Sequence, residues 1–209
     1  MKRTGFARRI SPRSLDGQDK RTNVATGRGN QLTKQAGEYI VAAELSRRGF
    51  IATTFTGNVP AYDIVAVDDQ GGHALVQVKA IAADSWQFTA SQFADVVFEG
   101  PKQVVRGPLA APYPDLICVM VQLAPADSER RDRFYVLPWR ELARIITDGH
   151  ARFLAKHDGV RPRSPKSLHT AVRPAALARW ENRWDVIKKR VKPANRPLQP
   201  ASGAPLEPE

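Results

Sequence analysis

The stretch at residues 62–80 constrains the fold of this chain most strongly. Two runs rich in β-branched residues flank a cluster of turn-forming residues at 68–73. This order predicts a β-hairpin. Because strand side chains alternate between faces, Asp63 points to one face of the first strand, and Gln77 and Lys79 share one face of the second.

A turn centred near Gly71 would place Val65 opposite Gln77, and Asp63 opposite Lys79. Directly opposed side chains lie roughly 5 Å apart, so a carboxylate, an amide and an ammonium would gather at one end of the hairpin. The alternative is an ordinary cross-strand ion pair between Asp63 and Lys79, because exposed pairs are common and contribute little.

A helix is predicted upstream, over residues 32–48, with Gly49 at its C-terminal cap. Glu38 lies on the same predicted face as the apolar side chains of Val41, Ala42 and Leu45. A carboxylate on an apolar stripe is costly to bury unless a cation or a hydrogen-bond donor meets it. The helix therefore brings a second acid that needs a partner.

Together these features resemble the PD-(D/E)xK nuclease superfamily, which includes restriction endonucleases and archaeal Holliday-junction resolvases. The resemblance covers residues 30–123 and is carried by short motifs, which are Gly37-Glu38, Gly49-Phe50, Asp63 and Gln77-Val78-Lys79. It implies a restriction-endonuclease-like α/β core, with a mixed central β-sheet flanked by helices in the order αβββαβ.

The resemblance also implies roles for single residues. Asp63 would be the metal-binding acid, Glu38 would complete the metal shell, and Lys79 would orient or activate the attacking water. The expected cofactor is Mg²⁺ or Mn²⁺, which would act on the phosphate as a Lewis acid and template. Magnesium usually takes only one or two protein carboxylates, so this small set is chemically reasonable.

Two positions depart from the family pattern. Gln77 stands where the family usually has Asp or Glu; its amide oxygen can ligate a hard cation but brings no negative charge. We therefore count Gln77 as a catalytic-site and metal-site candidate of a variant Gln-x-Lys motif. Tyr62 precedes Asp63, whereas the family's Pro occurs two positions earlier, at Pro60.

The formal charge of +11 is unevenly distributed along the chain. Basic residues dominate 1–29 and 152–192, whereas acids slightly outnumber bases in between. The predicted organisation is a flexible basic arm at 1–29, a nuclease-like core at 30–150, a basic extension with a helix at 151–192, and a disordered Pro/Ala-rich tail at 193–209. Basic segments around an acidic core suit a nucleic-acid enzyme; two solvated arms without a partner are the alternative.

Within the basic extension, a strip of five side chains is predicted to contact the DNA backbone. Such contacts position a protein on nucleic acid without reading its sequence. The five residues are Arg161, Arg163, Lys166, His169 and Arg173. His150, His157 and His169 are not spaced as zinc ligands, and we expect them to contact phosphates or solvent.

The rest of the core is predicted from hydrophobic patterns. Residues 82–100 are expected to end in a core helix, with Trp86 in the core or, alternatively, stacked on a base. The run 116–123 predicts a strand buried on both faces, with the lone Cys118 as an inert core residue. Further elements are a strand at 134–137, a helix at 139–147, and a final helix from Pro174 that docks through Leu177, Trp180, Trp184 and Ile187.

The same sequence excludes several classes of protein. It has no apolar run that could act as a signal peptide or cross a membrane, and no Gly-rich loop for a nucleotide cofactor. The single cysteine fits a reducing cytoplasm. Many members of the superfamily pair two sites in a homodimer, and the sequence leaves open whether this chain does.

The prediction is a Mg²⁺-dependent DNA endonuclease. The main alternative belongs to a different class: a protein that keeps the nuclease fold and binds nucleic acid but has lost cleavage. Gln77 is the best indication for this alternative. A third reading is an RNA-directed enzyme or an effector within a larger defence or repair assembly, because fold does not fix substrate.

Overall fold

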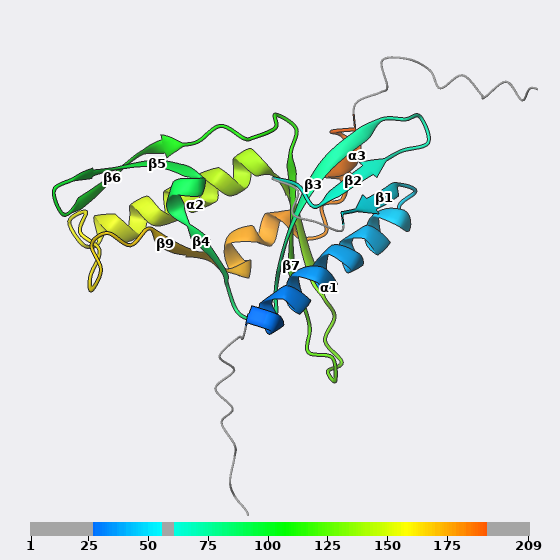
Figure 1. The fold of residues 1–209 in the computed structure, drawn as a ribbon, viewed down its shortest axis with the longest axis horizontal. Coiled ribbons are helices and arrows are strands. Elements are labelled where there is room, and N and C mark those ends of the chain that lie inside the picture. The colour runs from blue at the N-terminus through cyan, green and yellow to red at the C-terminus, as the bar shows by residue number, and fades with distance from the viewer. Residues whose placement is uncertain (1–26, 56–60, 192–209) are drawn as a thin grey trace, which may run out of the picture.

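The computed structural model describes residues 27–55 and 61–191. Pro60, the tail predicted from residue 193 and most of the basic arm predicted at 1–29 lie outside the described residues. The fold is mixed α/β, with a five-stranded sheet in the order β1-β2-β3-β7-β8 and helices on both of its faces (Figure 1). The strands are β1 (Ile51–Thr54), β2 (Ile64–Val67), β3 (His73–Ile81), β7 (Ile117–Gln122) and β8 (Arg133–Pro138).

The predicted hairpin is present as β2 and β3, but its register differs by two residues from the expected one. Val65 pairs with Leu75, not with Gln77, so the pairing of Asp63 with Lys79 is wrong. The turn explains the shift, because Asp68 Oδ1 accepts the backbone N–H groups of Gln70 and Gly72 and closes the loop one residue earlier. A shift of two keeps every side chain on its expected face.

Helix α1 (Gly27–Ser46) covers one face of the sheet. Its C-terminus is capped as predicted, since Gly49 has a φ of +88° and the N–H of Phe50 donates to the carbonyl of Leu45. Val41 and Leu45 are fully buried, which confirms the predicted apolar face. They pack against Ile64, Ala66, Val76, Val78, Val119 and Val136 of the sheet.

Helix α2 (Trp139–Ala155) covers the opposite face and follows Pro138 as predicted. It is longer than the expected helix, so the boundary expected at residue 150 falls inside it. Leu142 and Ile146 are buried against Met120 and Tyr135 of β7 and β8. Strand β7 runs parallel to β3 and is buried on both faces, which confirms the predicted central strand.

The helix expected within 82–100 is wrong. This part of the chain forms β4 (Trp86–Thr89), a short 3₁₀ turn η1 (Ala90–Gln92) and β5 (Ala94–Glu99), and β5 pairs with β6 (Lys102–Pro108). Short apolar runs have no decisive period, and pairing with β6 gives the backbone of β5 its hydrogen bonds. Parallel β3 and β7 are therefore connected through strands and not through a helix.

The predicted C-terminal helix is also replaced by shorter elements. The chain forms β9 (His169–Val172), a 3₁₀ helix η2 (Pro174–Trp180) and α3 (Asp185–Lys188). Asn182, with a φ of +54°, interrupts the helix between η2 and α3. The predicted stripe still docks on the core, since Leu177 and Ile187 are fully buried. In the part of the chain that the structure describes, every helix is too short or too polar to cross a bilayer.

Candidate active site

Asp63 lies directly before β2, at the end of the hairpin away from the turn and close to Lys34 of α1. Its backbone N–H donates to the carbonyl of Val76, and its Oδ2 accepts the N–H of Val78, both at 2.8 Å. The carboxylate thus takes the place of a backbone acceptor in the ladder. The other oxygen, Oδ1, lies 3.8 Å from the Nζ of Lys34 on α1, and the side chain is only 16% exposed.

Glu38 approaches Asp63 from α1. The helix can lie close to β3 because Gly37 has no side chain; a Cβ there would meet the Cβ of Ala80 at 2.3 Å. The Nζ of Lys34 lies 3.5 Å from Glu38 Oε1 and 3.8 Å from Asp63 Oδ1. Two acids from distant parts of the chain therefore share one ammonium group.

Glu38 Oε1 is a buried oxygen that accepts no hydrogen bond from any residue that the structure describes. The Lys34 ammonium is close enough for an ion pair but not for a hydrogen bond by the usual criteria. A buried carboxylate oxygen normally has a donor or a cation beside it. Glu38 Oε1 therefore has a cation beside it but lacks a hydrogen-bond donor among the described residues.

Gln77 and Lys79 lie next to one another on one face of β3, as predicted. Gln77 Oε1 is 3.9 Å from the Sγ of Cys118 on the neighbouring strand β7. The backbone carbonyl of Lys79 accepts a 2.8 Å hydrogen bond from the indole of Trp86. Trp86 is 2% exposed, which confirms its place in the core.

The buried thiol of Cys118 lies near charged groups on this face of the sheet. Burial raises the pKa of its thiol to about 12; the Lys79 ammonium lowers this pKa and the Asp63 carboxylate raises it. Both charges are therefore close enough to act on one buried thiol. Cys118 stays protonated at neutral pH, as expected for an inert core residue.

The structure thus places Glu38 and Asp63 around one ammonium, and places Gln77 and Lys79 on the adjacent strand. Lys34 was not singled out from the sequence. Its position four residues before Glu38 on a helix is the signal that could have found it.

The candidate ligands for a metal are two carboxylates and one amide. Among residues 27–55 and 61–191, no group of three or more His, Cys, Asp or Glu side chains is arranged to hold a metal ion. Glu38 Oε1 and Asp63 Oδ1, which both lie near the Lys34 ammonium, nevertheless fit a hard cation that keeps most of its waters.

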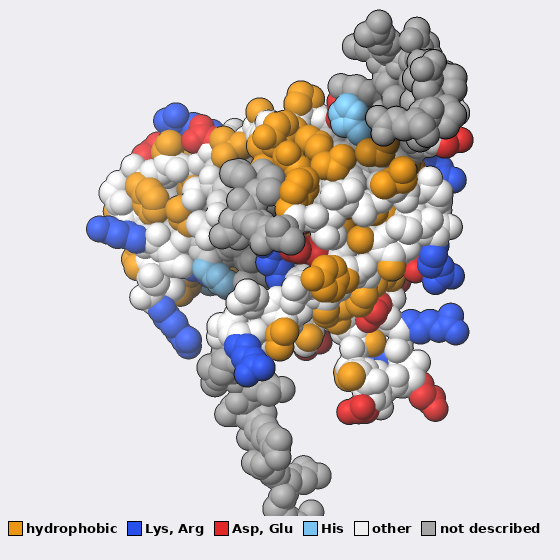
Figure 2. All heavy atoms as spheres, turned by 45° about the vertical axis from the view of Figure 1, so that its right-hand side comes forward, with side chains coloured by type: hydrophobic (Ala, Val, Ile, Leu, Met, Phe, Trp, Pro, Cys, Tyr) orange, Lys and Arg blue, Asp and Glu red, His pale blue; other side chains and the backbone are white. Residues whose placement is uncertain are grey.

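The predicted DNA-binding strip lies apart from these residues, on β9 and the loop that precedes it. Arg161 has a structural role, because its Nη1 donates to the carbonyl of His169 and its guanidinium lies 5.0 Å from the centre of the Phe153 ring. Arg163 and Lys166 are exposed and form no hydrogen bond or ion pair with other described residues. Figure 2 shows basic side chains projecting around the periphery of one face of the molecule.

His150 does not face phosphate or solvent, so that expectation is wrong. It is 1% exposed, and its Nε2 lies 2.9 Å from Oε1 of the buried Gln103. Burial lowers the pKa of His150, and the nearby Arg161 lowers it further. The ring is therefore a neutral structural group between α2 and β6.

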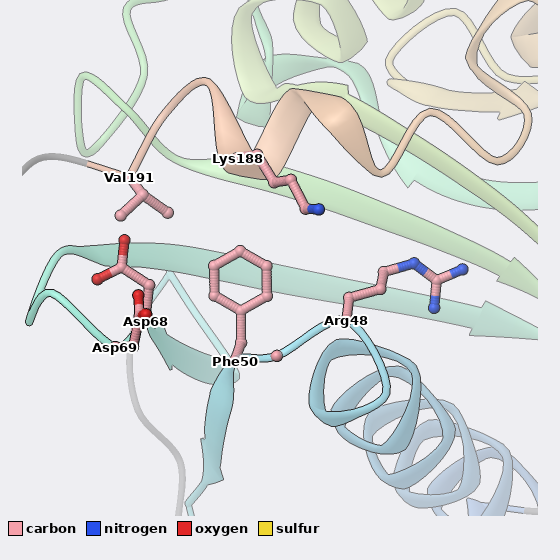
Figure 3. A pocket seen from close by; sticks show the side chains of 7 residues that line it. Arg48, Phe50, Asp68, Asp69, Lys188 and Val191 are labelled. Carbon is pink, nitrogen blue, oxygen red and sulfur yellow. The ribbon is translucent and has the colours of Figure 1, made fainter.

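A pocket of about 430 Å³ lies at the other end of the hairpin, beside the turn (Figure 3). It contains none of the four predicted catalytic residues. Its lining mixes two acids of the turn with two cations and apolar groups. The lining residues are Arg48, Gly49, Phe50, Asp68, Asp69, Lys188 and Val191.

Comparison with known proteins gives little further information. No protein-family model matches the chain, and no curated protein matches it. One solved structure that is similar is that of a bacterial homing endonuclease, I-Ssp6803I. Its sequence is 13% identical to this chain and the TM-score is 0.44. The match covers 77% of this chain and 93% of that chain. A likeness at this level assigns neither a family nor an activity to the chain.

Proposed function

We propose that the protein is a metal-dependent endonuclease that hydrolyses phosphodiester bonds of DNA. The observation that supports this most directly is the meeting of Glu38 and Asp63 around Lys34 Nζ, at 3.5 and 3.8 Å. A site that attracts one cation between two half-buried carboxylates can also hold a divalent ion. The lysine of the neighbouring strand supplies a second positive charge for a phosphate.

In this proposal Asp63 and Glu38 hold Mg²⁺ or Mn²⁺, with the Gln77 amide as a neutral third donor. The bound ion would neutralise charge on the phosphoryl oxygens and lower the pKa of a bound water. Asp63 is well suited to this role, because the N–H of Val78 fixes one of its oxygens and so orients the other.

Lys79 is the proposed catalytic lysine. Its backbone is held by the Trp86 indole, so the side chain starts from a fixed point on β3. The ammonium would donate a hydrogen bond to the attacking water or to a nonbridging phosphate oxygen, and so orient one against the other. Oriented donors of this kind stabilise the charge that develops in the transition state.

The test is cleavage of a labelled panel of single-stranded, duplex, nicked, flapped and four-way-junction DNA, together with one RNA. Each substrate is incubated with Mg²⁺ or Mn²⁺, and with a chelator as control. Lys79→Ala and Asp63→Asn are expected to abolish cleavage while DNA binding and the melting temperature stay close to wild type. Cleavage by either variant at the wild-type rate would refute the site assignment.

A second function, a nuclease-fold protein that binds nucleic acid without cutting it, is favoured by two observations. Gln77 lacks the charge of the usual acid, and the Lys34 ammonium already pairs with both Glu38 and Asp63. Calorimetric titration with Mn²⁺ separates the two functions. Binding that disappears in Asp63→Asn supports the enzyme; absence of binding in the wild type, with tight DNA binding and no cleavage, supports the binding module.

A further inference from the structure

The small sheet formed by β4 and β9 is a polar ribbon anchored beside the candidate active site. We propose that its outward face enters the major groove of duplex DNA and reads the edges of bases. This inference rests on the proposed function in one respect, which is that duplex DNA is the partner.

The ribbon is attached to the strand that carries Lys79. Strand β4 begins at Trp86, whose indole donates to the Lys79 carbonyl at 2.8 Å. The loop before β4 is held to the end of β7, because the Gln122 amide donates to the carbonyl of Ala83 at 3.0 Å. From there β4 and β9 run together away from the central sheet, beside α2 (Figure 1). The position of the ribbon relative to the candidate active site is therefore fixed.

The inward face of the ribbon is part of the core. Trp86, Phe88 and Val172 are 2%, 7% and 3% exposed, and they pack in the same cluster as the apolar side of α2. Because strand side chains alternate, the intervening residues of both strands must point outward. The ribbon cannot rotate without exposing this apolar face.

The outward face carries side chains that suit base recognition. Gln87 pairs across the strands with Ala171, and Thr89 pairs with His169; all four residues are exposed. Ala171, opposite Gln87, has only a methyl side chain, and Gln87 is exposed. Within the described residues, the only polar contacts of the Gln87 amide are with Ser85, at 2.8 Å to its Oγ and 3.4 Å to its carbonyl.

Charge is distributed as a groove-binding ribbon requires. Neither β4 nor β9 contains an acidic residue, whereas Arg163 and Lys166 precede β9 and Arg173 follows it. These three cations are exposed. Cations at the ends and uncharged hydrogen-bonding groups between them match the usual division of labour, in which phosphate contacts position the protein and base contacts specify the sequence.

The dimensions also fit. Two strands lie about 4.8 Å apart, and a four-residue strand is about 13 Å long. The major groove is about 12 Å wide and admits a two-stranded β-ribbon. Gln can form two hydrogen bonds to adenine there, and the methyl group of Thr can contact the methyl group of thymine. The ribbon therefore has one face with which to read a short sequence.

The experiment is a binding selection from a library of DNA duplexes with a randomised centre, carried out without divalent cations so that cleavage plays no part. We expect the wild type to enrich particular bases and Gln87→Ala to lose about tenfold of the preference at one base pair. Thr89→Ala should weaken the preference at a neighbouring pair. Affinity for the unselected library and the salt dependence should stay unchanged in both variants.

Gln70→Ala is the matched control, because Gln70 is an exposed glutamine on the hairpin turn, outside the ribbon. It should enrich the same bases as the wild type, and all variants should melt at the wild-type temperature. Unchanged preferences in Gln87→Ala and Thr89→Ala would overturn the inference, as would a wild type that binds duplexes without base preference or does not bind them. Because cleavage is assayed separately, a nuclease that binds without base preference would overturn the ribbon and leave the proposed function standing.

Discussion

Lys34 Nζ lies 3.5 Å from Glu38 and 3.8 Å from Asp63, the two carboxylates that we propose as metal ligands. Its ammonium group and a divalent ion would compete for the same two carboxylates. We expect Lys34→Met to lower the dissociation constant for Mn²⁺ several-fold, measured by calorimetric titration. Lys102→Met, an exposed lysine on β6, is the control and should bind Mn²⁺ like the wild type. Weaker binding in Lys34→Met would instead make Lys34 part of the metal-binding arrangement.

Gly37 sets how closely α1 approaches β3. A methyl group at this position would meet the Cβ of Ala80 at 2.3 Å, and both atoms belong to packed backbone elements. Gly37→Ala should therefore lower the free energy of unfolding by about 1–3 kcal/mol, as overpacking does. Cleavage should fall as well, because the change moves Glu38.

Gly149 provides a matched comparison within α2. A Cβ there would meet no other atom within 4 Å. Gly149→Ala should raise the free energy of unfolding by up to about 1 kcal/mol, since Ala is the better helix former. Urea unfolding of both variants measures the difference, and equal effects would show that close packing of α1 does not limit stability.

At the scale of elements, a buried network holds the basic loop before β9 in place. Gln103 on β6 is 3% exposed; its amide donates to the carbonyls of Pro165 and Ser167 and accepts a hydrogen bond from His150. Gln103→Leu removes these three hydrogen bonds at a buried position and leaves their polar partners unpaired. We expect a loss of roughly 2–3 kcal/mol in stability, with weaker DNA binding because the loop that carries Lys166 loses its anchor.

The same network predicts how stability depends on pH. Burial lowers the pKa of His150, and the nearby Arg161 lowers it further. Among the described residues, the buried Nδ1 of His150 has no hydrogen-bond partner. The unfolded chain therefore binds a proton more readily than the folded chain. The stability contributed by neutral His150 is present above the unfolded pKa of about 6.5 and is lost as the pH falls through the lower folded pKa.

The measurement is urea unfolding at pH 7.5 and pH 5.5. The wild type should be less stable at pH 5.5, and the difference should shrink in His150→Gln, which keeps a hydrogen-bond donor but does not titrate in this range. An identical difference in the two proteins would assign the pH dependence to other groups.

At the scale of the whole molecule, acids lie at the site and exposed cations lie near the ribbon. Arg163 and Lys166 are exposed and form no ion pair with other described residues, whereas Arg161 is engaged within the fold. Arg163→Ala with Lys166→Ala should weaken binding uniformly across sequences and reduce the slope of log affinity against log salt by about 2.

Lys188→Ala with Lys189→Ala removes the same charge at the C-terminal end of α3, where Lys189 pairs with Asp185 Oδ2. There Lys188 faces the pocket beside the hairpin turn (Figure 3), at the end of the hairpin away from the site. The slope of this variant should stay close to that of the wild type. Equal slopes for the two double variants would show that DNA responds only to net charge and not to the loop before β9.

The parts of the fold that could be predicted depend on neighbours in sequence. Alternating residues indicated the hairpin and placed Gln77 and Lys79 on one face, and the helical period placed Glu38 on the buried side of α1. Gly49 marked the end of that helix. Each of these signals is set by local backbone geometry, so each could be recognised without knowing what the segment packs against.

The parts that could not be predicted depend on distant partners. Residues 94–99 form a strand because β6 pairs with them, and β4 is completed by β9, more than 75 residues later. The hairpin register was decided by side-chain hydrogen bonds of Asp68 within the turn. Pairing supplies the hydrogen bonds that a short segment needs, and its own sequence does not say where they come from.

The sequence by itself determined which chemical groups the chain offers and the face of each element on which they lie. Only the tertiary structure decided which of them meet: Lys34 with two acids, Asp63 with the N–H of Val78, and His150 with Gln103. The physical reason is that periodicity fixes a side chain's direction within its own element. Its distance from a partner on another element is fixed only by packing and strand pairing.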